Sequence, residues 1–230
     1  MSDRTRSLIG LYAAVSALVA VLLAPLLALS YFATSEGAGE LGRGTVSAWA
    51  EPARDAVGGL VTWASADRAY STYVQLFALL FAGVFLCALA VRSRRHPTGA
   101  NERWGWRIAL TGYALAGAGL LAVSIGLAAG GPESGAVNVA FLALLLPGMF
   151  LSVIGSTVLG IAFLRGGYRP RLTSWLLTLA FPSMVVVPTL LGHNSLGMLP
   201  LIVAWGATGL RLWREGEPEF PRSLTAADPA

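Results

Sequence analysis

The 230-residue sequence contains little charge, because Asp, Glu, Lys and Arg together make up only 12% of it, against 55% hydrophobic residues. This is about half the charged fraction of an ordinary soluble domain, too little to cover a surface exposed to water. The charges also gather between long uncharged stretches, a pattern typical of membrane-spanning helices joined by loops. We therefore predict an all-α integral membrane protein with a single membrane domain.

Lysine is absent, so all 16 basic residues are arginine. Alongside abundant Ala, Gly, Leu and Val, this one-sided choice indicates GC-rich coding rather than selection for the bidentate chemistry of guanidinium groups. The formal net charge of +4 is compatible with nucleic-acid binding, but the arginines flank the apolar stretches and are explained better by membrane topology. We predict no nucleic-acid partner.

Cysteine and histidine are almost absent as well. Cys87 is the only cysteine and lies in an apolar run, which excludes an intrachain disulfide and a cysteine-based metal cluster. The two histidines, His96 and His193, fall in loops that we predict on opposite sides of about 30 Å of hydrocarbon. We therefore predict no metal site and no cofactor.

The uncharged run 137–164 is long enough to cross a membrane as a helix. Within it, Gly148, Ser152, Ser156 and Gly160 recur every four residues and so lie along one face. Small side chains on one face form a groove into which another helix packs closely. We predict such a helix-packing groove, occupied either by a helix of the same chain or by one of a second copy.

Six apolar runs in all have this character, which predicts a six-helix bundle. A six-span membrane domain then covers residues 1–214, and a polar tail rich in proline and small residues follows at 215–230 and is predicted to be mobile. The predicted spans are residues 8–33, 72–91, 108–129, 137–164, 172–191 and 196–212.

The longest polar interval, residues 34–71, separates the first two predicted spans. From Pro52 onward its apolar residues fall on one side of a helix, which predicts an amphipathic helix at residues 45–66 that lies on the membrane surface. A lid resting on the bundle is the alternative interpretation. Candidate contact residues on this external segment are Trp49, Val57, Leu60 and Trp63.

The distribution of arginine predicts the orientation. Alternation through six spans puts both termini and two arginine-rich loops on one side, with 13 arginines against three on the other. By the positive-inside rule the arginine-rich side is cytoplasmic, which predicts a plasma-membrane protein with both termini inside. The arginine loops are expected to contact anionic lipid headgroups.

Charged and histidine side chains are missing from the middle of every predicted span. Because such residues mark ion and proton pathways, this absence disfavours a proton-driven pump or a channel with a charged lining. Pro147, Pro182, Pro188 and Pro200 interrupt the last spans. They are consistent with simple kinks, but they also leave open a carrier that uses broken helices to bind uncharged cargo.

The turn between the last two spans holds the polar residues His193, Asn194 and Ser195. At the outer surface, Ser195 paired with His193 and a carboxylate from Glu133 or Asp67 would suit a hydrolase. The interpretation we favour is that Asn194 or Ser195 caps the final helix while His193 is solvated. We predict no catalytic residues.

An arginine-only basic set and the Trp104-Gly105-Trp106 loop give the chain a resemblance to uncharacterised multi-pass membrane proteins encoded in GC-rich bacterial genomes. The resemblance implies a membrane bundle and no particular activity.

Three functions are compatible with these observations. The leading hypothesis is a non-enzymatic membrane protein that works through packing and partner contact, with a second copy or another membrane protein as partner. The alternatives are a permease for an uncharged or lipid-like solute and, third, a membrane-surface hydrolase. A cavity of a few hundred Å³ that reaches the midplane, lined by Gln75, Asn138, Ser152 or Ser156, would favour the permease. A closed, dry bundle would favour the leading hypothesis.

Overall fold

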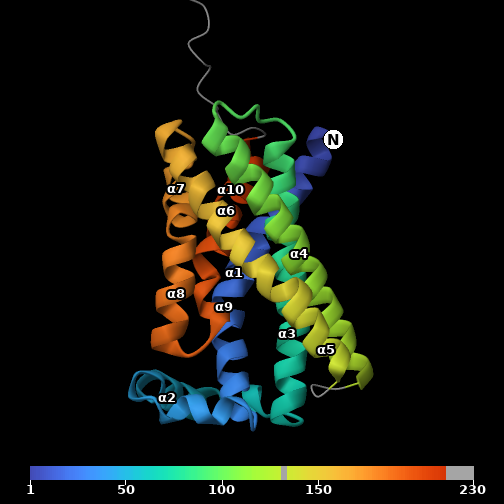
Figure 1. Cartoon of the computed structure of the whole chain (residues 1–230). Helices are drawn as coiled ribbons and strands as arrows, with labels where there is room; N and C mark the ends of the chain where they lie inside the picture. Colours follow the sequence, from blue (N-terminus) through green and yellow to red (C-terminus); the bar gives the residue numbers. More distant parts are fainter. Residues whose placement is uncertain (131–133, 216–230) are drawn as a thin grey trace, which may run out of the picture.

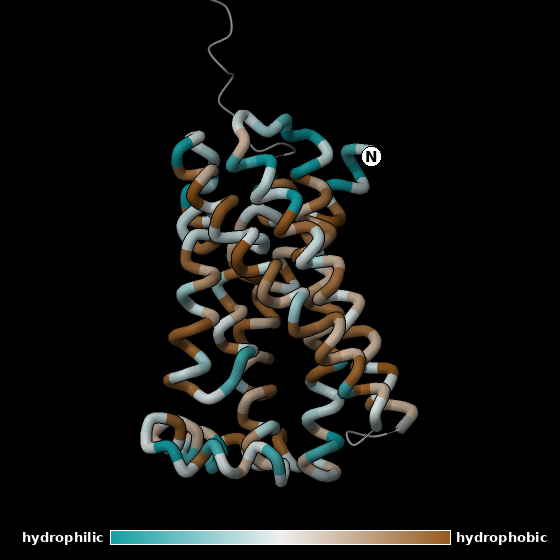
Figure 2. Tube along the Cα trace, viewed as in Figure 1, coloured by the Kyte–Doolittle hydropathy of each residue, from teal (hydrophilic) through white to brown (hydrophobic). Residues whose placement is uncertain are grey.

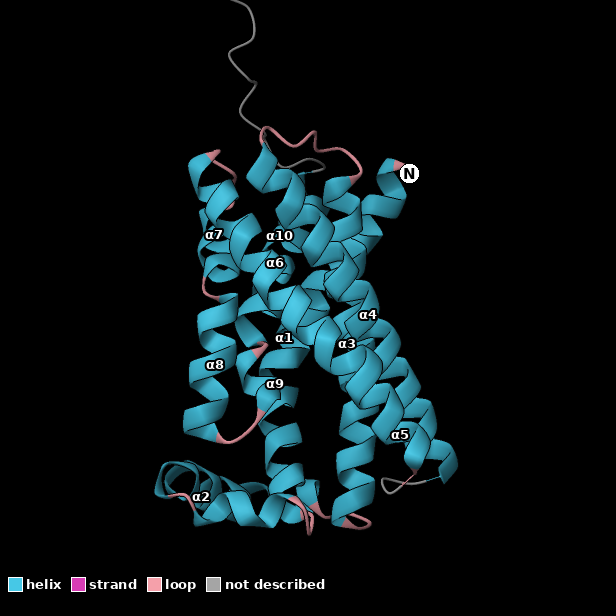
Figure 3. Cartoon of the chain, viewed as in Figure 1, coloured by secondary structure: helices cyan, strands magenta, loops and turns pink. Residues whose placement is uncertain are grey.

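The computed structural model describes residues 1–130 and 134–215, and this part of the chain folds into helices joined by short connections (Figures 1 and 3). Glu133 and the predicted tail from residue 216 onward lie outside the described residues. The elements are α1 (Asp3–Ala33), η1 (Gly37–Gly42), α2 (Gly44–Val61), α3 (Ala66–Arg92), α4 (Ala100–Gly130), α5 (Gly135–Ala140), η2 (Phe141–Leu145), α6 (Leu146–Arg165), α7 (Arg171–Thr178), α8 (Ala180–Leu191), α9 (Asn194–Gly197) and α10 (Leu199–Glu215).

Four helices are long and apolar enough to cross a membrane: α1, α3, α4 and the continuous run 135–165 formed by α5, η2 and α6. The pair α7 and α8 adds a fifth candidate if it is counted as one bent span. In Figure 2 the hydrophobic residues fill the middle of the bundle and the hydrophilic ones gather at its two ends. The predicted all-helical fold is confirmed for the described residues, which include four to five helices long and apolar enough to be candidate membrane spans.

The predicted span 172–191, which we expected its prolines to interrupt, is a bent pair of helices. It divides at Leu179 into α7 and α8, which are bent by 56°. Pro182 has no N–H to donate to the carbonyl four residues earlier, so the helical ladder is interrupted there. The hydroxyl of Thr157 on α6 accepts a hydrogen bond from the backbone N–H of Phe181 at 3.1 Å, which holds the break in place.

The predicted span 137–164 also changes its hydrogen-bonding pattern partway along. At η2 the helix is π-helical, and the backbone N–H of Leu146 donates to the carbonyl of Phe141, five residues earlier. Pro147 follows directly and removes the next regular donor. A π turn next to a proline is a common way for a long helix to bend without ending.

The predicted groove of α6 is filled by α4 of the same chain. A Cβ placed on Gly148 would lie 2.3 Å from the backbone nitrogen of Ala116, and one on Gly112 would lie 2.2 Å from that of Ser152. The two backbones therefore touch, which only glycine allows. Further along, Gly160 faces α7 instead, where a Cβ would lie 2.4 Å from the backbone nitrogen of Thr178.

Residues on α1 and α10 make a second seam of this kind, which we did not predict. A Cβ on Gly10 would lie 2.5 Å from the carbonyl oxygen of Gly209, and one on Gly206 would lie 2.1 Å from the Cβ of Ala17. The first and last helices of the described chain thus lie against each other at backbone distance.

Helix α2 lies across the end of the bundle opposite the N-terminus, which we call the α2 end (Figure 1). Val46 and Ala50 on this helix are buried. Trp49 is half-buried and packs edge-on against Phe32 of α1, with ring centroids 5.9 Å apart. One face of α2 therefore rests on the bundle, as the lid interpretation requires.

Candidate functional site

A cavity of about 430 Å³ lies between α1, α3, α4, the α5–η2–α6 run and α9. It extends into the middle of the bundle, because Phe81 and Ala116 lie near the centres of α3 and α4, and Met149 lies near the centre of the run 135–165. Its volume falls within the range of sites that bind small molecules. The lining residues are Leu27, Tyr31, Glu36, Tyr70, Val74, Phe77, Phe81, Ala116, Leu120, Val123, Leu127, Val137, Asn138, Phe141, Leu145, Met149, Gly192, His193, Asn194, Ser195 and Met198.

The polar part of the lining is at the α2 end. Tyr31, Tyr70 and His193 place three rings in mutual contact there, with centroids 5.2 Å apart for Tyr31 and His193, 5.5 Å for the two tyrosines and 6.4 Å for Tyr70 and His193. Glu36, just before η1, and Asn194 are exposed residues of the same lining. The remaining wall is almost wholly apolar, so the cavity has a polar entrance and an apolar interior.

Among the described residues that line the cavity, Glu36 is the only charged one. Its side chain makes no ion pair or hydrogen bond with any residue in the described ranges 1–130 and 134–215. The described part of the lining contains no arginine. The described lining therefore carries one negative charge, on the exposed Glu36, without a compensating positive charge.

His193 differs from the solvated residue we predicted. It is the N-cap of α9, and its Nδ1 accepts a hydrogen bond from the backbone N–H of Ser195 at 3.2 Å. The expectation that Asn194 or Ser195 is the cap is therefore wrong. Because the imidazole is packed among aromatic rings, burial lowers the pKa of His193 to about 4 and the ring is neutral at pH 7.

The serine and histidine of the proposed hydrolase do meet, with Ser195 Oγ 2.8 Å from His193 Nδ1. However, the Ser195 hydroxyl also donates to the carbonyl of Ala24 at 2.9 Å, and Nδ1 already accepts the backbone N–H of Ser195. Among the described residues, no carboxylate hydrogen-bonds to the imidazole and so none orients it as a general base. This geometry is that of a helix cap tied to α1.

Aromatic packing fills the half of the bundle nearer the N-terminus. Trp106 and Trp205 lie with ring centroids 5.9 Å apart, and the Trp205 indole N–H donates to the hydroxyl of Tyr113 at 2.9 Å. That hydroxyl is 2.6 Å from Ser156 Oγ. Trp106 is only 1% exposed, because its ring packs against Phe163 of α6 and Trp205 of α10.

A buried ion pair lies at the same end. Arg95 Nε donates to Glu102, and Arg95 Nη2 donates to its second carboxylate oxygen at 3.2 Å. Glu102 also accepts from the backbone N–H of Thr98 at 3.2 Å. The Arg95 guanidinium lies 5.0 Å from the ring centroid of Phe163 and 5.4 Å from that of Tyr168. Sequence reasoning had given Arg95 only a role in topology, and nothing in its spacing distinguishes it from its exposed neighbours.

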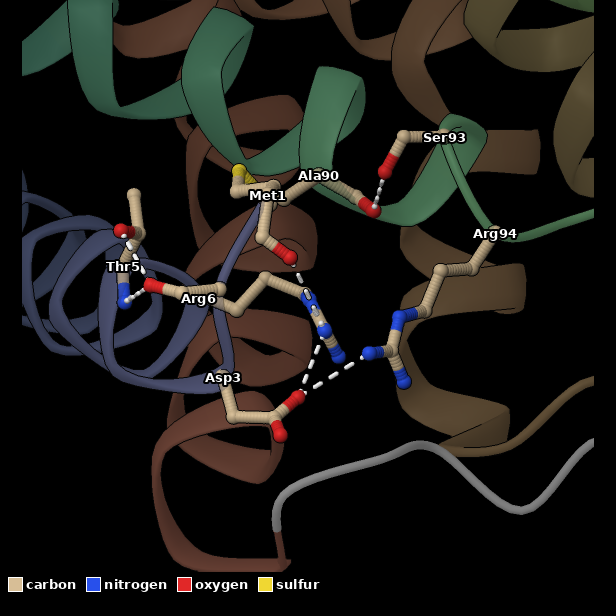
Figure 4. Close-up of polar contacts among 8 residues, drawn as sticks. Met1, Asp3, Thr5, Arg6, Ala90, Ser93 and Arg94 are labelled. Carbon is tan, nitrogen blue, oxygen red and sulfur yellow. Dashed lines mark hydrogen bonds and ion pairs between the residues drawn. The ribbon is translucent and has the colours of Figure 1, made fainter.

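At the N-terminal surface, Asp3 connects α1 to the loop after α3 (Figure 4). Its Oδ1 lies 2.6 Å from Arg6 Nη2 and 3.0 Å from Arg94 Nη2. The carboxylate is highly exposed, so we assign these contacts a minor energetic role.

The other predicted site residues are divided between the seam, the cavity and the surface. Ser152 and Ser156 are buried between helices and do not line the cavity, and Gln75 does not line it either; Asn138 does. Leu60 and Trp63 are more than half exposed at the α2 end, whereas Val57 is half-buried. Within the described residues, no three side chains of the types that ligate metals converge.

Sequence reasoning missed the cavity wall, although its residues do follow a pattern. Tyr70, Val74, Phe77 and Phe81 on α3 are spaced by four, three and four residues, and the α4 residues Ala116, Leu120, Val123 and Leu127 repeat that spacing. Such stripes identify inward faces, but a stripe that lines a cavity and one that packs against a helix have the same spacing.

No protein-family model, curated protein or solved structure matches the chain.

Proposed function

We propose that the chain crosses the plasma membrane six times, with the N-terminal end cytoplasmic and the α2 end outside. The bent pair α7 and α8 supplies the fifth crossing, and α9 with the 17-residue α10 supplies the sixth. The excess of arginine in the loops at the N-terminal end supports this orientation.

In this membrane the protein acts as a permease for a lipid-like solute. We assign the conformation described above to the outward-facing state, in which the solute binds. The observation that carries the proposal is the cavity of about 430 Å³, which runs from polar residues at the α2 end to the middle of the bundle. Its apolar wall suits a hydrocarbon or ring system, and its polar entrance suits a head group. The hypothesis of a packing protein loses its main support, because α4 of the same chain already fills the small-residue groove.

The two irregular helices give the bundle places to move. The η2 turn contributes Phe141 and Leu145 directly to the cavity wall, and the break at Leu179 is held by hydrogen bonds to Thr157 rather than by a continuous ladder. Transport requires the closed end to open, so the Arg95–Glu102 pair must separate from its aromatic neighbours during the cycle.

Cysteine labelling from outside the cell tests the cavity. In a Cys87→Ala background, Leu120→Cys places a thiol in the lining of the cavity. The adjacent Leu121 is 60% exposed on the outer surface of α4, so Leu121→Cys places a thiol that faces lipid. A membrane-impermeant thiosulfonate should label residue 120 and leave residue 121 unmodified, because a thiol surrounded by lipid does not ionise. A lipid-like solute such as 1-decanol should slow labelling at residue 120. Equal labelling of both positions, or no protection, contradicts a binding cavity.

The permease mechanism is tested from the other side of the membrane. Ser156→Cys places a near-isosteric thiol in the fully buried aromatic cluster. In inside-out vesicles this thiol should react slowly with the same reagent, and 1-decanol should change the rate, because a permease exposes its closed half for part of its cycle. A thiol that never reacts, although residue 120 is labelled from outside, indicates a static binding protein.

A further inference from the structure

We propose that the lipid-like solute carries a positive charge on its head group, so that the cavity selects amphipathic cations such as alkylammonium compounds. This inference rests on the proposed function and specifies its ligand class. Three independent features of the entrance support it: an unpaired carboxylate, a group of aromatic rings, and the local balance of charge.

The carboxylate is Glu36. It lines the cavity without an ion pair in the described part of the chain, and no cationic side chain lines the site with it. His193 does not supply a positive charge, because burial lowers its pKa to about 4. A cation bound here neutralises an existing charge, whereas an anion meets only repulsion.

The rings belong to Tyr31, Tyr70 and His193. All three line the cavity beside Glu36, and their centroids lie 5.2 to 6.4 Å apart, so they present a continuous aromatic surface. Aromatic faces attract ammonium groups, most strongly where water is excluded, and surfaces built from several rings recognise quaternary ammonium. A carboxylate next to aromatic rings therefore suits a methylated ammonium head better than a neutral hydroxyl.

The segment around the entrance, residues 34–71, also carries more negative than positive charge. Between residues 34 and 71 the sequence has five acidic residues, Glu36, Glu40, Glu51, Asp55 and Asp67, against three arginines, Arg43, Arg54 and Arg68. Arg43 is paired with Glu40 and so does not neutralise the site. An excess of negative charge near an apolar cleft raises the local concentration of cations and lowers that of anions.

The interior of the cavity accommodates the apolar part of such a molecule. The lining between the rings and the middle of the bundle includes Phe77, Phe81 and Leu120, and each of these side chains is at most 9% exposed. A flexible alkyl chain or an aromatic group buried there gains about 25 cal/mol per Å² of apolar surface removed from water. The polar groups of the lining lie at one end only, so the head group has a fixed place.

Three molecules with the same ten-carbon tail test the charge preference: decyltrimethylammonium, 1-decanol and decyl sulfate. The readout is protection of Leu120→Cys from a neutral thiol reagent in the full-length Cys87→Ala protein, below the micellar concentration of each compound. Decyltrimethylammonium should protect at a concentration about tenfold lower than 1-decanol, and decyl sulfate should protect least.

Two pairs of variants assign this preference to the entrance. Glu36→Gln keeps the shape of the side chain and should reduce the advantage of the cation about tenfold, whereas Glu51→Gln removes an exposed acidic charge outside the lining and should reduce it far less. Tyr70→Leu should weaken protection by the cation, and Tyr70→Phe should retain it, since the face of the ring and not its hydroxyl attracts the charge.

The outcomes separate the two proposals. If all three compounds protect equally, or if Glu36→Gln and Glu51→Gln behave alike, the charge preference is wrong and the lipid-binding cavity stands. If none of the compounds protects although residue 120 is labelled, the proposed function itself is overturned.

Discussion

Replacing Gly112 by alanine should separate α4 and α6, whose backbones are in direct contact. The new Cβ would lie 2.2 Å from the backbone nitrogen of Ser152, whereas ordinary van der Waals contact begins at 3.4 Å. Since neither atom belongs to a flexible side chain, α4 and α6 must move apart by roughly 1 Å. A gap of this size forfeits about a quarter to a half of the dispersion energy of the atoms that face it.

In a membrane the lost dispersion energy lowers the stability of the bundle directly, because helix association there depends on packing and not on expulsion of water. Overpacking of this kind costs about 1–3 kcal/mol. For a chain of this size that corresponds to a melting temperature lower by roughly 2–12 °C. The assay is thermal unfolding of the purified protein in a neutral detergent, followed by tryptophan fluorescence.

Gly117 of the same helix provides a matched control, because a Cβ there would meet no atom within 4 Å. Gly117→Ala should gain the same stabilisation from higher helix propensity, up to about 1 kcal/mol, without the clash that a Cβ at residue 112 makes with Ser152. The difference between the two variants therefore isolates the contact between α4 and α6. If Gly112→Ala is as stable as Gly117→Ala, the backbones of these helices are not in contact and the reasoning fails.

Three other predictions concern charge and topology. Arg95→Ala should destabilise the protein by about 3–5 kcal/mol in the same melting assay, because it leaves Glu102 buried without its cation, and Arg95→Lys should recover only part of the loss. His193 has a depressed pKa in the folded protein, so the unfolded chain takes up its proton first as the pH falls. Stability should decline between about pH 6.5 and 4. His193→Gln should flatten that part of the profile; an unchanged slope would show that another group is responsible. Reporter fusions after residue 100 should score cytoplasmic and those after residue 133 external; the reverse pattern would invert the orientation.

Much of the architecture follows from sequence because a membrane imposes simple rules. Apolar length predicted that residues 137–164 form a long helix, and the structure has one continuous helical run at 135–165. The four-residue spacing of Gly148 and Ser152 indicated a face for close packing, since only small side chains let backbones touch. Such inferences need no knowledge of the partner element.

The choice of partner depended on the tertiary structure. The groove of α6 receives α4 over most of its length and α7 at Gly160, which no spacing within α6 encodes. Similarly, Trp104 and Trp106 each lie between Gly105 and an arginine, yet Trp104 is exposed and Trp106 is buried against Trp205 of α10. Burial depends on the neighbouring helix, which comes from a distant part of the chain.

The same limit explains why the candidate site was not found from the sequence. Apolar stripes on α3 and α4 indicated inward faces, but whether two such faces meet or leave space between them depends on how the helices diverge. Composition and periodicity determined that this chain forms several helices long and apolar enough to cross a membrane, because apolar length is a property of each segment by itself. The cavity beside His193 and Glu36 was decided only by folding, since empty space is a property of several helices together.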